Sequence, residues 1–344
     1  MRYKLLGKSG LRVAEICLGA MTFGDDWGWG AARDESRKQF DLYAEAGGNF
    51  IDTANLYTNG SSERLVGEFI TGERDKWVVA TKYTFNNQSS EVNLSGNHRK
   101  NMVQSVNASL KRLNTDYIDL LWLHGWDFTT PVDEVMRSFD DLIRAGKILY
   151  AGVSDTPAWI VAKANTLAEL RGWSPFIALQ VEYSLRQRTP ERDLIPMAQH
   201  FDIGVTAWSP LGGGVLTGKY NKGGEIDTGG RLPNGAKESD LKIAAKVLEI
   251  ADEIGRSASQ VALNWLRQQD SRFGSIIPIV GARKTEQLQD NLACVEFELT
   301  PEQIARLNEA SKIELGFPHD FLKSDTVHKF ALSGTLENID NHRA

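Results

Sequence analysis

The sequence has little cysteine: only Cys17 and Cys294 occur in 344 residues. Because they lie far apart in the chain, they suit a reducing compartment and support neither a disulfide framework nor a cysteine-based zinc site. The six histidines show no spacing typical of metal ligands, so no metal site is expected. The start of the chain lacks an apolar signal segment, and no stretch approaches the roughly 20 apolar residues of a membrane span. A cytoplasmic location is therefore expected.

The sequence also lacks an excess of positive charge. It has 39 basic and 45 acidic residues, and its formal net charge is -6. Hydrophobic residues make up 41% and charged residues 24%, which is typical of a soluble globular protein. This balance favours neither a nucleic-acid partner nor an anionic membrane, so small molecules are the expected partners. It gives no indication of the oligomeric state.

Short apolar runs rich in β-branched residues recur along the chain, separated by segments with helical spacing. In the helical segments, apolar residues such as Val103, Val106 and Leu110 share one face. Gly47 and Gly146 follow two such segments, as C-terminal glycine caps do. The runs predict eight strands, at 15–19, 49–53, 77–82, 117–124, 149–154, 177–182, 203–209 and 275–281. These alternations predict a parallel sheet closed into a (β/α)8 TIM barrel, with a doubly wound sheet as the competing architecture.

Two segments lie outside a minimal barrel. Residues 3–13 alternate in polarity around a Lys-Ser-Gly turn, which predicts a hairpin before the first barrel strand. Residues 211–239 form a glycine-rich connection after the seventh strand, and loops of that length are usually functional or disordered. No repeat or linker divides the sequence, so residues 1–344 are expected to form one barrel domain with a tail from about 315 to 344.

Polar residues end three neighbouring predicted strands. Asp52, Lys82 and His124 lie at the carboxyl ends of the second, third and fourth runs. In a barrel these ends meet on the face where barrel enzymes keep their active sites. Singly, Asp52 is explained by a turn cap, Lys82 by solvent exposure and His124 by hydrogen bonding in the core. Their convergence favours a functional site.

The chemistry of these residues fits that of Tyr57, which lies five positions after Asp52. A partly buried Lys82 ammonium needs an anionic neighbour, and Asp52 supplies one. The same positive charge is expected to lower the pKa of the Tyr57 phenol from its usual value of about 10. Tyr57 is then a candidate proton donor or acceptor near neutral pH, while His124 can orient a carbonyl oxygen.

These four residues, in the contexts FIDTANLY, ATKY and LLWLHGWD, resemble the catalytic tetrad of the aldo-keto reductases. The resemblance runs from about residue 1 to residue 313, and the hairpin resembles the family's plug across the barrel bottom. It implies that Asp52, Tyr57, Lys82 and His124 are catalytic and that the cofactor is NADPH. We therefore expect a reductase of aldehydes or ketones in which Tyr57 protonates the carbonyl oxygen.

The resemblance also implies where NADPH binds. In the motifs GVSD, LQVEYS and AWSPLGGG, contacts to the nicotinamide are expected from Ser154, Asp155, Gln180 and Trp208. Contacts to the pyrophosphate and its ribose are expected from Ser209, Leu211, Gly213 and Lys219. The segment VGARKTEQLQDN resembles the one that receives the adenosine half, through Gly281, Arg283, Gln287, Asp290 and Asn291.

Two of these positions depart from the family pattern. Asp155 stands where the family often has asparagine, so it can accept a hydrogen bond from the carboxamide amino group but cannot donate to its oxygen. Asp290 stands where glutamate is common, and its shorter side chain is expected to weaken an adenine contact.

Two other functions remain open. A lysine at a barrel strand end can act as a nucleophile, so a Schiff-base aldolase using Lys82 is one alternative. A non-catalytic nucleotide-sensing subunit is the other, because the family includes potassium-channel β subunits. A Rossmann dehydrogenase is disfavoured because no Gly-x-Gly-x-x-Gly follows the first strand. A short-chain reductase is disfavoured because no tyrosine has a lysine four residues later.

Aromatic residues in loops at the active face predict a substrate pocket. Trp27, Trp29, Trp126 and Phe128 suit apolar carbonyls or the faces of sugars, although tryptophans packing beneath a loop explain the same pattern. The tail from 315 to 344 is expected either to cover this pocket or, in its last part LENIDNHRA, to be disordered.

Overall fold

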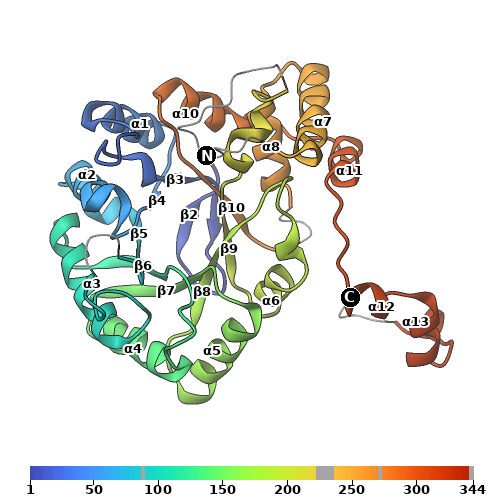
Figure 1. Ribbon diagram of the computed structural model, residues 1–344, viewed down its shortest axis with the longest axis horizontal. Coiled ribbons are helices and arrows are strands. Elements are labelled where there is room, and N and C mark those ends of the chain that lie inside the picture. The colour runs from blue at the N-terminus through green and yellow to red at the C-terminus, as the bar shows by residue number, and fades with distance from the viewer. Residues whose placement is uncertain (87–89, 222–235, 270–272, 341–344) are drawn as a thin grey trace.

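Eight parallel strands close into a barrel that helices surround (Figure 1). This computed structural model describes residues 1–86, 90–221, 236–269 and 273–340. The strands follow one another in chain order, and the last pairs with the first through Ile279 opposite Cys17. They are β3 (Cys17–Gly19), β4 (Phe50–Asp52), β5 (Val78–Tyr83), β6 (Ile118–Leu123), β7 (Ile148–Ser154), β8 (Phe176–Glu182), β9 (Gly204–Trp208) and β10 (Ile276–Val280). The predicted (β/α)8 barrel and its eight strands are confirmed.

The helices lie on the outside of the barrel, where their apolar faces cover the strands (Figure 1). Gly47 and Gly146 follow the helices α1 (Arg33–Glu45) and α4 (Val132–Arg144) with φ of +82° and +68°, so both predicted glycine caps are confirmed. No helix in the described ranges is long and apolar enough to cross a membrane. The helices are α1 (Arg33–Glu45), α2 (Ser61–Ile70), α3 (Arg99–Leu113), α4 (Val132–Arg144), α5 (Ala158–Arg171), α6 (Leu194–His200), α7 (Glu238–Ile254), α8 (Ala258–Arg267), α10 (Thr285–Leu292) and α11 (Pro301–Ala310).

The barrel strands are buried on both faces. Every residue of β5 and of β6 is buried, because one face of each strand meets the helices and the other fills the barrel interior. The interior is closed by large side chains such as Trp122, Phe50 and Ile277. Lys82 is a fully buried charged residue near the end of β5, and the site depends on it.

An antiparallel hairpin closes one end of the barrel. The predicted hairpin is confirmed as β1 (Tyr3–Leu5) and β2 (Arg12–Ala14). Its Leu6 belongs to the interior cluster, and the Lys4 ammonium donates to the Ile276 carbonyl at 2.9 Å. Because Ile276 begins β10, the hairpin lies at the amino ends of the strands, opposite the predicted site.

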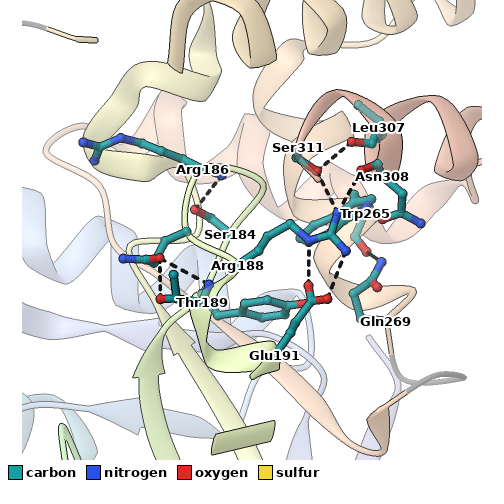
Figure 2. Close-up of polar contacts among 12 residues, drawn as sticks. Ser184, Arg186, Arg188, Thr189, Glu191, Trp265, Gln269, Leu307, Asn308 and Ser311 are labelled. Carbon is teal, nitrogen blue, oxygen red and sulfur yellow. Dashed lines mark hydrogen bonds and ion pairs between the residues drawn. The ribbon is translucent and has the colours of Figure 1, made fainter. Parts of the chain in front are cut away.

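A buried ion pair fastens the connection after β8 to α11 (Figure 2). Arg188 is 5% exposed, and it donates to the two carboxylate oxygens of Glu191 at 2.6 and 3.0 Å. Its Nη1 donates to the Asn308 carbonyl and to the Ser311 hydroxyl, both at 3.0 Å. The guanidinium also lies 5.5 Å from the Trp265 ring. Since an unpaired buried charge is costly, these contacts hold together segments that are distant in sequence.

We expect Ser311→Ala to lower the free energy of unfolding by about 1.5–3 kcal/mol, because the buried Arg188 guanidinium loses a hydrogen-bond acceptor. Urea denaturation of the variant and the original chain measures the difference. Ser90→Ala, at an exposed position, should change this free energy by less than about 0.5 kcal/mol. A Ser311→Ala effect as small as that of the control would show that the contact does not contribute to stability.

The C-terminal tail stands apart from the barrel (Figure 1). It contains α12 (His319–Leu322) and α13 (Asp325–Ala331), and its base is held by Arg192, which donates to the Glu314 carbonyl at 2.7 Å. Phe317 and Phe330 remain 86% and 78% exposed. The described part of the tail therefore does not pack over the predicted pocket. Residues 341–344, and residues 222–235 of the glycine-rich connection, lie outside the described residues.

Candidate active site

The predicted polar residues lie together at the carboxyl ends of adjacent strands. Asp52 is the last residue of β4, Lys82 lies near the end of β5, and His124 directly follows β6. Because β4 pairs with β5 and β5 with β6, these side chains emerge side by side. Tyr57 begins a 3-10 turn (Tyr57–Gly60) that follows β4.

The Lys82 ammonium is held in a fully buried position. It donates to Asp52 Oδ2 at 2.5 Å and to the Thr53 carbonyl at 2.8 Å. Asp52 Oδ1 in turn accepts a hydrogen bond from Gln180 Nε2 at 3.0 Å. Burial lowers the pKa of Lys82, but Asp52 and Tyr57 together outweigh it, so the pKa stands above its ordinary value. Lys82 is therefore an ammonium at neutral pH.

Tyr57 lies against this ammonium, with Lys82 Nζ 4.7 Å from its ring centroid. Burial raises the pKa of the Tyr57 phenol, while the charge of Lys82 and a hydrogen bond with it lower that pKa. Burial prevails, and the pKa lies above 10, so the expectation of a lowered value is wrong. Lys82 acts in the predicted direction, but the sequence does not reveal that burial of the partly exposed Tyr57 outweighs its effect on the pKa. The phenol is protonated at neutral pH.

His124 lies beside Tyr57 and is neutral. The two rings are 6.0 Å apart and nearly perpendicular, at 82°. Burial, with a smaller contribution from Lys82, holds the pKa of His124 well below its usual range. Its Nδ1 is buried and has no hydrogen-bond partner among the described residues. A neutral imidazole has one donor and one acceptor nitrogen, so His124 can bind a carbonyl oxygen without protonating it.

The residues predicted to hold the nicotinamide end the next strands around the barrel. Ser154 ends β7 and is 1% exposed, and Gln180 in β8 is 3% exposed. Asp155 has φ of +43°, a conformation that aspartate tolerates, and accepts a hydrogen bond from Trp208 Nε1 at 3.2 Å. Burial raises the pKa of Asp155, with Trp208 and Lys82 opposing it. Ser154 and Gln180 are thus buried and Gln180 contacts Asp52, while Asp155 remains exposed beside Trp208.

A glycine-rich turn after β9 suits a phosphate group. In the 3-10 segment Gly212–Thr217, Gly213 and Gly214 have φ of +67° and +90°. The Ser209 hydroxyl accepts a hydrogen bond from the Gly213 amide at 3.1 Å. A β-carbon at Gly214 would lie 3.3 Å from the Lys219 ammonium, so glycine leaves room there. Backbone amides in such turns, next to a lysine, favour an anion. The remaining predicted residue here, Leu211, precedes the turn and packs against the core.

The predicted adenosine segment begins where β10 ends. A β-carbon at Gly281 would lie 2.9 Å from the Gly19 carbonyl oxygen, so only glycine fits there without a shift. The Arg283 amide donates to Gln287 Oε1 at 3.1 Å, which orders the start of α10. Asn291 is buried near the end of this helix.

Asp290 has contacts that the sequence did not suggest. Its carboxylate accepts hydrogen bonds from the Ser257 hydroxyl at 2.7 Å and from Gln260 Nε2 at 2.8 Å. Ser257 is the N-cap of α8, so Asp290 secures the start of that helix. Across the described ranges, no three histidine, cysteine, aspartate or glutamate side chains are grouped to hold a metal ion.

The sequence also matches the profile of a known family. The sequence profile described as "Aldo/keto reductase family" matches residues 15–312. The chain belongs to the aldo/keto reductase family. This aldo/keto reductase is 37% identical to norsolorinic acid reductase of Aspergillus flavus, over 97% of this chain and 87% of that protein.

Two further relatives have comparable similarity. The aldo/keto reductase is 39% identical to aryl-alcohol dehydrogenase [NADP(+)] of Phanerodontia chrysosporium, over 94% of this chain and 90% of that protein. It is 40% identical to norsolorinic acid reductase B of Dothistroma septosporum, over 94% of this chain and 84% of that protein. Family membership and these relatives support an oxidoreductase acting on carbonyl compounds.

Aromatic residues surround Tyr57 and His124 in this aldo/keto reductase. The Trp27 ring lies 6.3 Å from that of Tyr57, and Trp29 lies 5.5 Å from Trp27. Phe85, whose ring lies 4.8 Å from that of His124, is a contact that the sequence interpretation missed. Its position three residues after Lys82, just beyond β5, was the available signal.

The two aromatic residues predicted after β6 contribute differently. Trp126 is partly buried and packs against the core. Phe128 is 73% exposed and has φ of +57°. Trp126 is therefore held in place by packing, whereas Phe128 projects from the loop.

Proposed function

We propose that the chain reduces aldehydes or ketones with NADPH and that Tyr57 protonates the carbonyl oxygen. The observation that carries this proposal is the fully buried Lys82 ammonium, fixed by Asp52 beside a protonated phenol. When bound, the nicotinamide supplies the hydride, and the protein supplies position and the proton. The residues predicted for the cofactor fit this group, because Gln180 contacts Asp52 and the neighbouring Ser154 has a buried hydroxyl with no hydrogen-bond partner among the described residues.

Each residue of the group has a distinct role in this proposal. The neutral His124 orients the carbonyl oxygen, which places it within reach of the Tyr57 hydroxyl. Tyr57 then donates its proton, and the Lys82 ammonium stabilises the phenolate that remains. Asp52 keeps Lys82 charged and pointed at Tyr57. Gln180 in turn holds Asp52 through its second oxygen.

The contacts of Lys82 argue against a Schiff-base aldolase. An imine forms from a neutral amine, whereas the pKa of Lys82 is raised and its ammonium donates to Asp52 and Thr53. Borohydride reduction in the presence of substrate should leave Lys82 unmodified, and a trapped adduct would reverse this choice. Steady-state turnover with a carbonyl substrate separates an enzyme from a nucleotide-sensing subunit.

We further propose that the substrate is an aromatic carbonyl compound. The rings of Trp27 and Phe85 border Tyr57 and His124, and flat apolar rings bind aromatic faces well. The relative named aryl-alcohol dehydrogenase [NADP(+)] supports the same class. A panel of aromatic and aliphatic aldehydes of matched size, assayed with NADPH and with NADH, should give the highest kcat/KM for the aromatic members. Equal values would contradict this substrate class.

We expect Arg283→Ala to weaken NADPH binding roughly 10- to 150-fold and to leave NADH binding nearly unchanged. A planar guanidinium can make two hydrogen bonds to the 2′-phosphate, and a charge-assisted contact contributes about 1.5–3 kcal/mol. Dissociation constants for both cofactors, measured by quenching of tryptophan fluorescence, test this.

The neighbouring Lys284 provides a matched control for Arg283. It is also basic and exposed, but its ammonium is a point charge that cannot make the paired hydrogen bonds of a guanidinium, so Lys284→Ala should change the NADPH dissociation constant less than about 3-fold. An equal loss of affinity for both cofactors in Arg283→Ala would mean that Arg283 does not bind the 2′-phosphate. Tighter binding of NADH than of NADPH by the unmodified chain would overturn the proposal that NADPH is the cofactor.

A further inference from the structure

The residues Gly24–Gly30, called here the tryptophan loop, form a loop closed at its base. The Gly24 amide donates to the Ala31 carbonyl at 2.8 Å, and the Ala31 amide donates to the Thr22 carbonyl at 2.7 Å. Gly30 has φ of +139°, and a β-carbon there would lie 2.1 Å from the Gly24 carbonyl oxygen. Only glycine fits at this crossing, so the base of the loop has one defined geometry.

Two threonine hydroxyls attach the base to both halves of the site. Thr22 Oγ1 donates to the Ala282 carbonyl at 2.8 Å, next to Arg283. Thr58 Oγ1, next to Tyr57, donates to the Phe23 carbonyl at 2.7 Å. Thr22 is 4% exposed and Thr58 is fully buried, so both bonds are shielded from water. The base of the tryptophan loop is therefore fixed relative to both segments, whereas its tip is not held by these bonds.

The tip of the tryptophan loop fills the space between these two segments with rings. Trp27 lies edge-on to Tyr57 at 6.3 Å, and Trp29 lies 5.5 Å from Trp27. The Arg283 guanidinium carbon lies 5.6 Å from the Trp29 ring centroid. A continuous row of contacts thus runs from Arg283 to Tyr57.

We propose that Trp29 positions the Arg283 guanidinium for the 2′-phosphate, and that the tryptophan loop couples this recognition to the substrate site at Tyr57. The inference rests on the proposed NADPH dependence and extends it to the way in which the cofactor and the substrate influence each other. Trp29 is a positioning residue here, since it acts through Arg283.

The physical basis is the restriction of a flexible cation before its ligand arrives. A free arginine side chain loses rotamer freedom when it binds a phosphate, and that loss opposes binding. The face of Trp29 attracts the guanidinium and so restricts it in advance. A guanidinium lying over a ring keeps its N–H groups directed outward in its own plane, where they can bind phosphate oxygens.

Coupling to Tyr57 follows from the shared loop. A 2′-phosphate that fixes Arg283 also fixes Trp29, and through it Trp27, which borders Tyr57. Linkage is reciprocal. If the bound 2′-phosphate orders the tryptophan loop and so strengthens substrate binding, the bound substrate strengthens binding of the 2′-phosphate by the same factor. The carbonyl substrate should then have a lower KM with NADPH than with NADH.

The test is Trp29→Leu, with dissociation constants for NADPH, NADH and adenosine 2′,5′-bisphosphate measured by calorimetry. We expect NADPH and the bisphosphate to bind about 2- to 5-fold more weakly, while NADH is unaffected. The double variant Trp29→Leu with Arg283→Ala should bind NADPH no more weakly than Arg283→Ala alone. Trp29→Phe, which keeps a ring, should restore part of the loss.

Trp173→Leu is a matched control, because Trp173 also has an arginine against its ring, with the Arg137 guanidinium carbon 5.8 Å from the ring centroid. Trp173 lies in the connection between α5 and β8, away from the carboxyl ends of the strands. It should leave all three dissociation constants unchanged. With each cofactor saturating, Trp29→Leu should also abolish the difference in substrate KM between NADPH and NADH.

The outcomes separate this inference from the proposed function. If the unmodified chain binds NADH as tightly as NADPH, the proposed cofactor itself is wrong. If the chain prefers NADPH but Trp29→Leu weakens both cofactors equally or neither, the positioning role of Trp29 is overturned. An unchanged difference in substrate KM between the two cofactors would overturn the coupling.

Discussion

Replacing Tyr57 with phenylalanine should lower kcat for carbonyl reduction about 10²- to 10⁴-fold, the usual contribution of a positioned general acid. The substitution removes one hydroxyl and keeps the ring that packs against Trp27 and His124. The Kd for NADPH should therefore stay close to that of the unmodified chain. Steady-state rates with an aromatic aldehyde and fluorescence titration with NADPH measure the two quantities.

Tyr3→Phe is the matched control for this result. It also removes one phenol oxygen, but Tyr3 lies in the hairpin at the closed end of the barrel, and its hydroxyl donates to the Gly47 carbonyl. Its kcat should be unchanged. Near-normal turnover in Tyr57→Phe would remove Tyr57 from the mechanism, and a parallel loss of NADPH affinity would indicate a collapsed site.

Replacing Lys82 with methionine should lower kcat about 10²- to 10³-fold, because the charge that stabilises the Tyr57 phenolate is lost. Methionine nearly matches the length of the aliphatic stem, but it leaves the buried Asp52 carboxylate without its ion partner. The single variant should thus also be less stable. Adding Asp52→Asn should recover stability without recovering kcat, which separates the chemical role from the structural one.

The pH dependence of Lys82→Met has a definite sign. Reduction requires the protonated phenol, so the rate is constant around neutral pH and falls once the pH exceeds the pKa of Tyr57. Burial raises that pKa, and Lys82 opposes the increase. Without Lys82 the pKa rises further, so the alkaline fall in rate should move to higher pH. A variant with an unchanged rate and pH profile would contradict a part for Lys82 in catalysis.

Residue spacing was sufficient to predict the barrel and the grouping of Asp52, Lys82 and His124. Strands buried on both faces leave continuous apolar runs, and a charged residue at the end of such a run is visible without a structure. Neighbouring strands in chain order are also neighbours in the barrel, so three strand ends predict one site. Those features depend on local sequence and on connectivity alone.

Features that depend on packing between distant segments could not be predicted. The direction of the Tyr57 pKa depends on the balance between burial and Lys82, and the sequence identifies only the second. The bonds of Asp290 to Ser257 and Gln260 depend on the packing of α8 against α10, and its predicted contact with the cofactor stays a prediction. The contact between Trp29 and Arg283 joins the two ends of the barrel sequence, and no local pattern indicates it.

The pairing of β10 with β3 has a consequence for synthesis of the chain. Ile279 must meet Cys17 to close the barrel, and Arg188 donates to Ser311, 123 residues further along the chain. During synthesis Ile279 and Ser311 emerge long after Cys17 and Arg188, so β3 keeps an open edge and Arg188 stays hydrated until these partners arrive. The chain therefore completes this part of its core only after α11 has emerged, and until β10 arrives one edge of β3 has no strand partner.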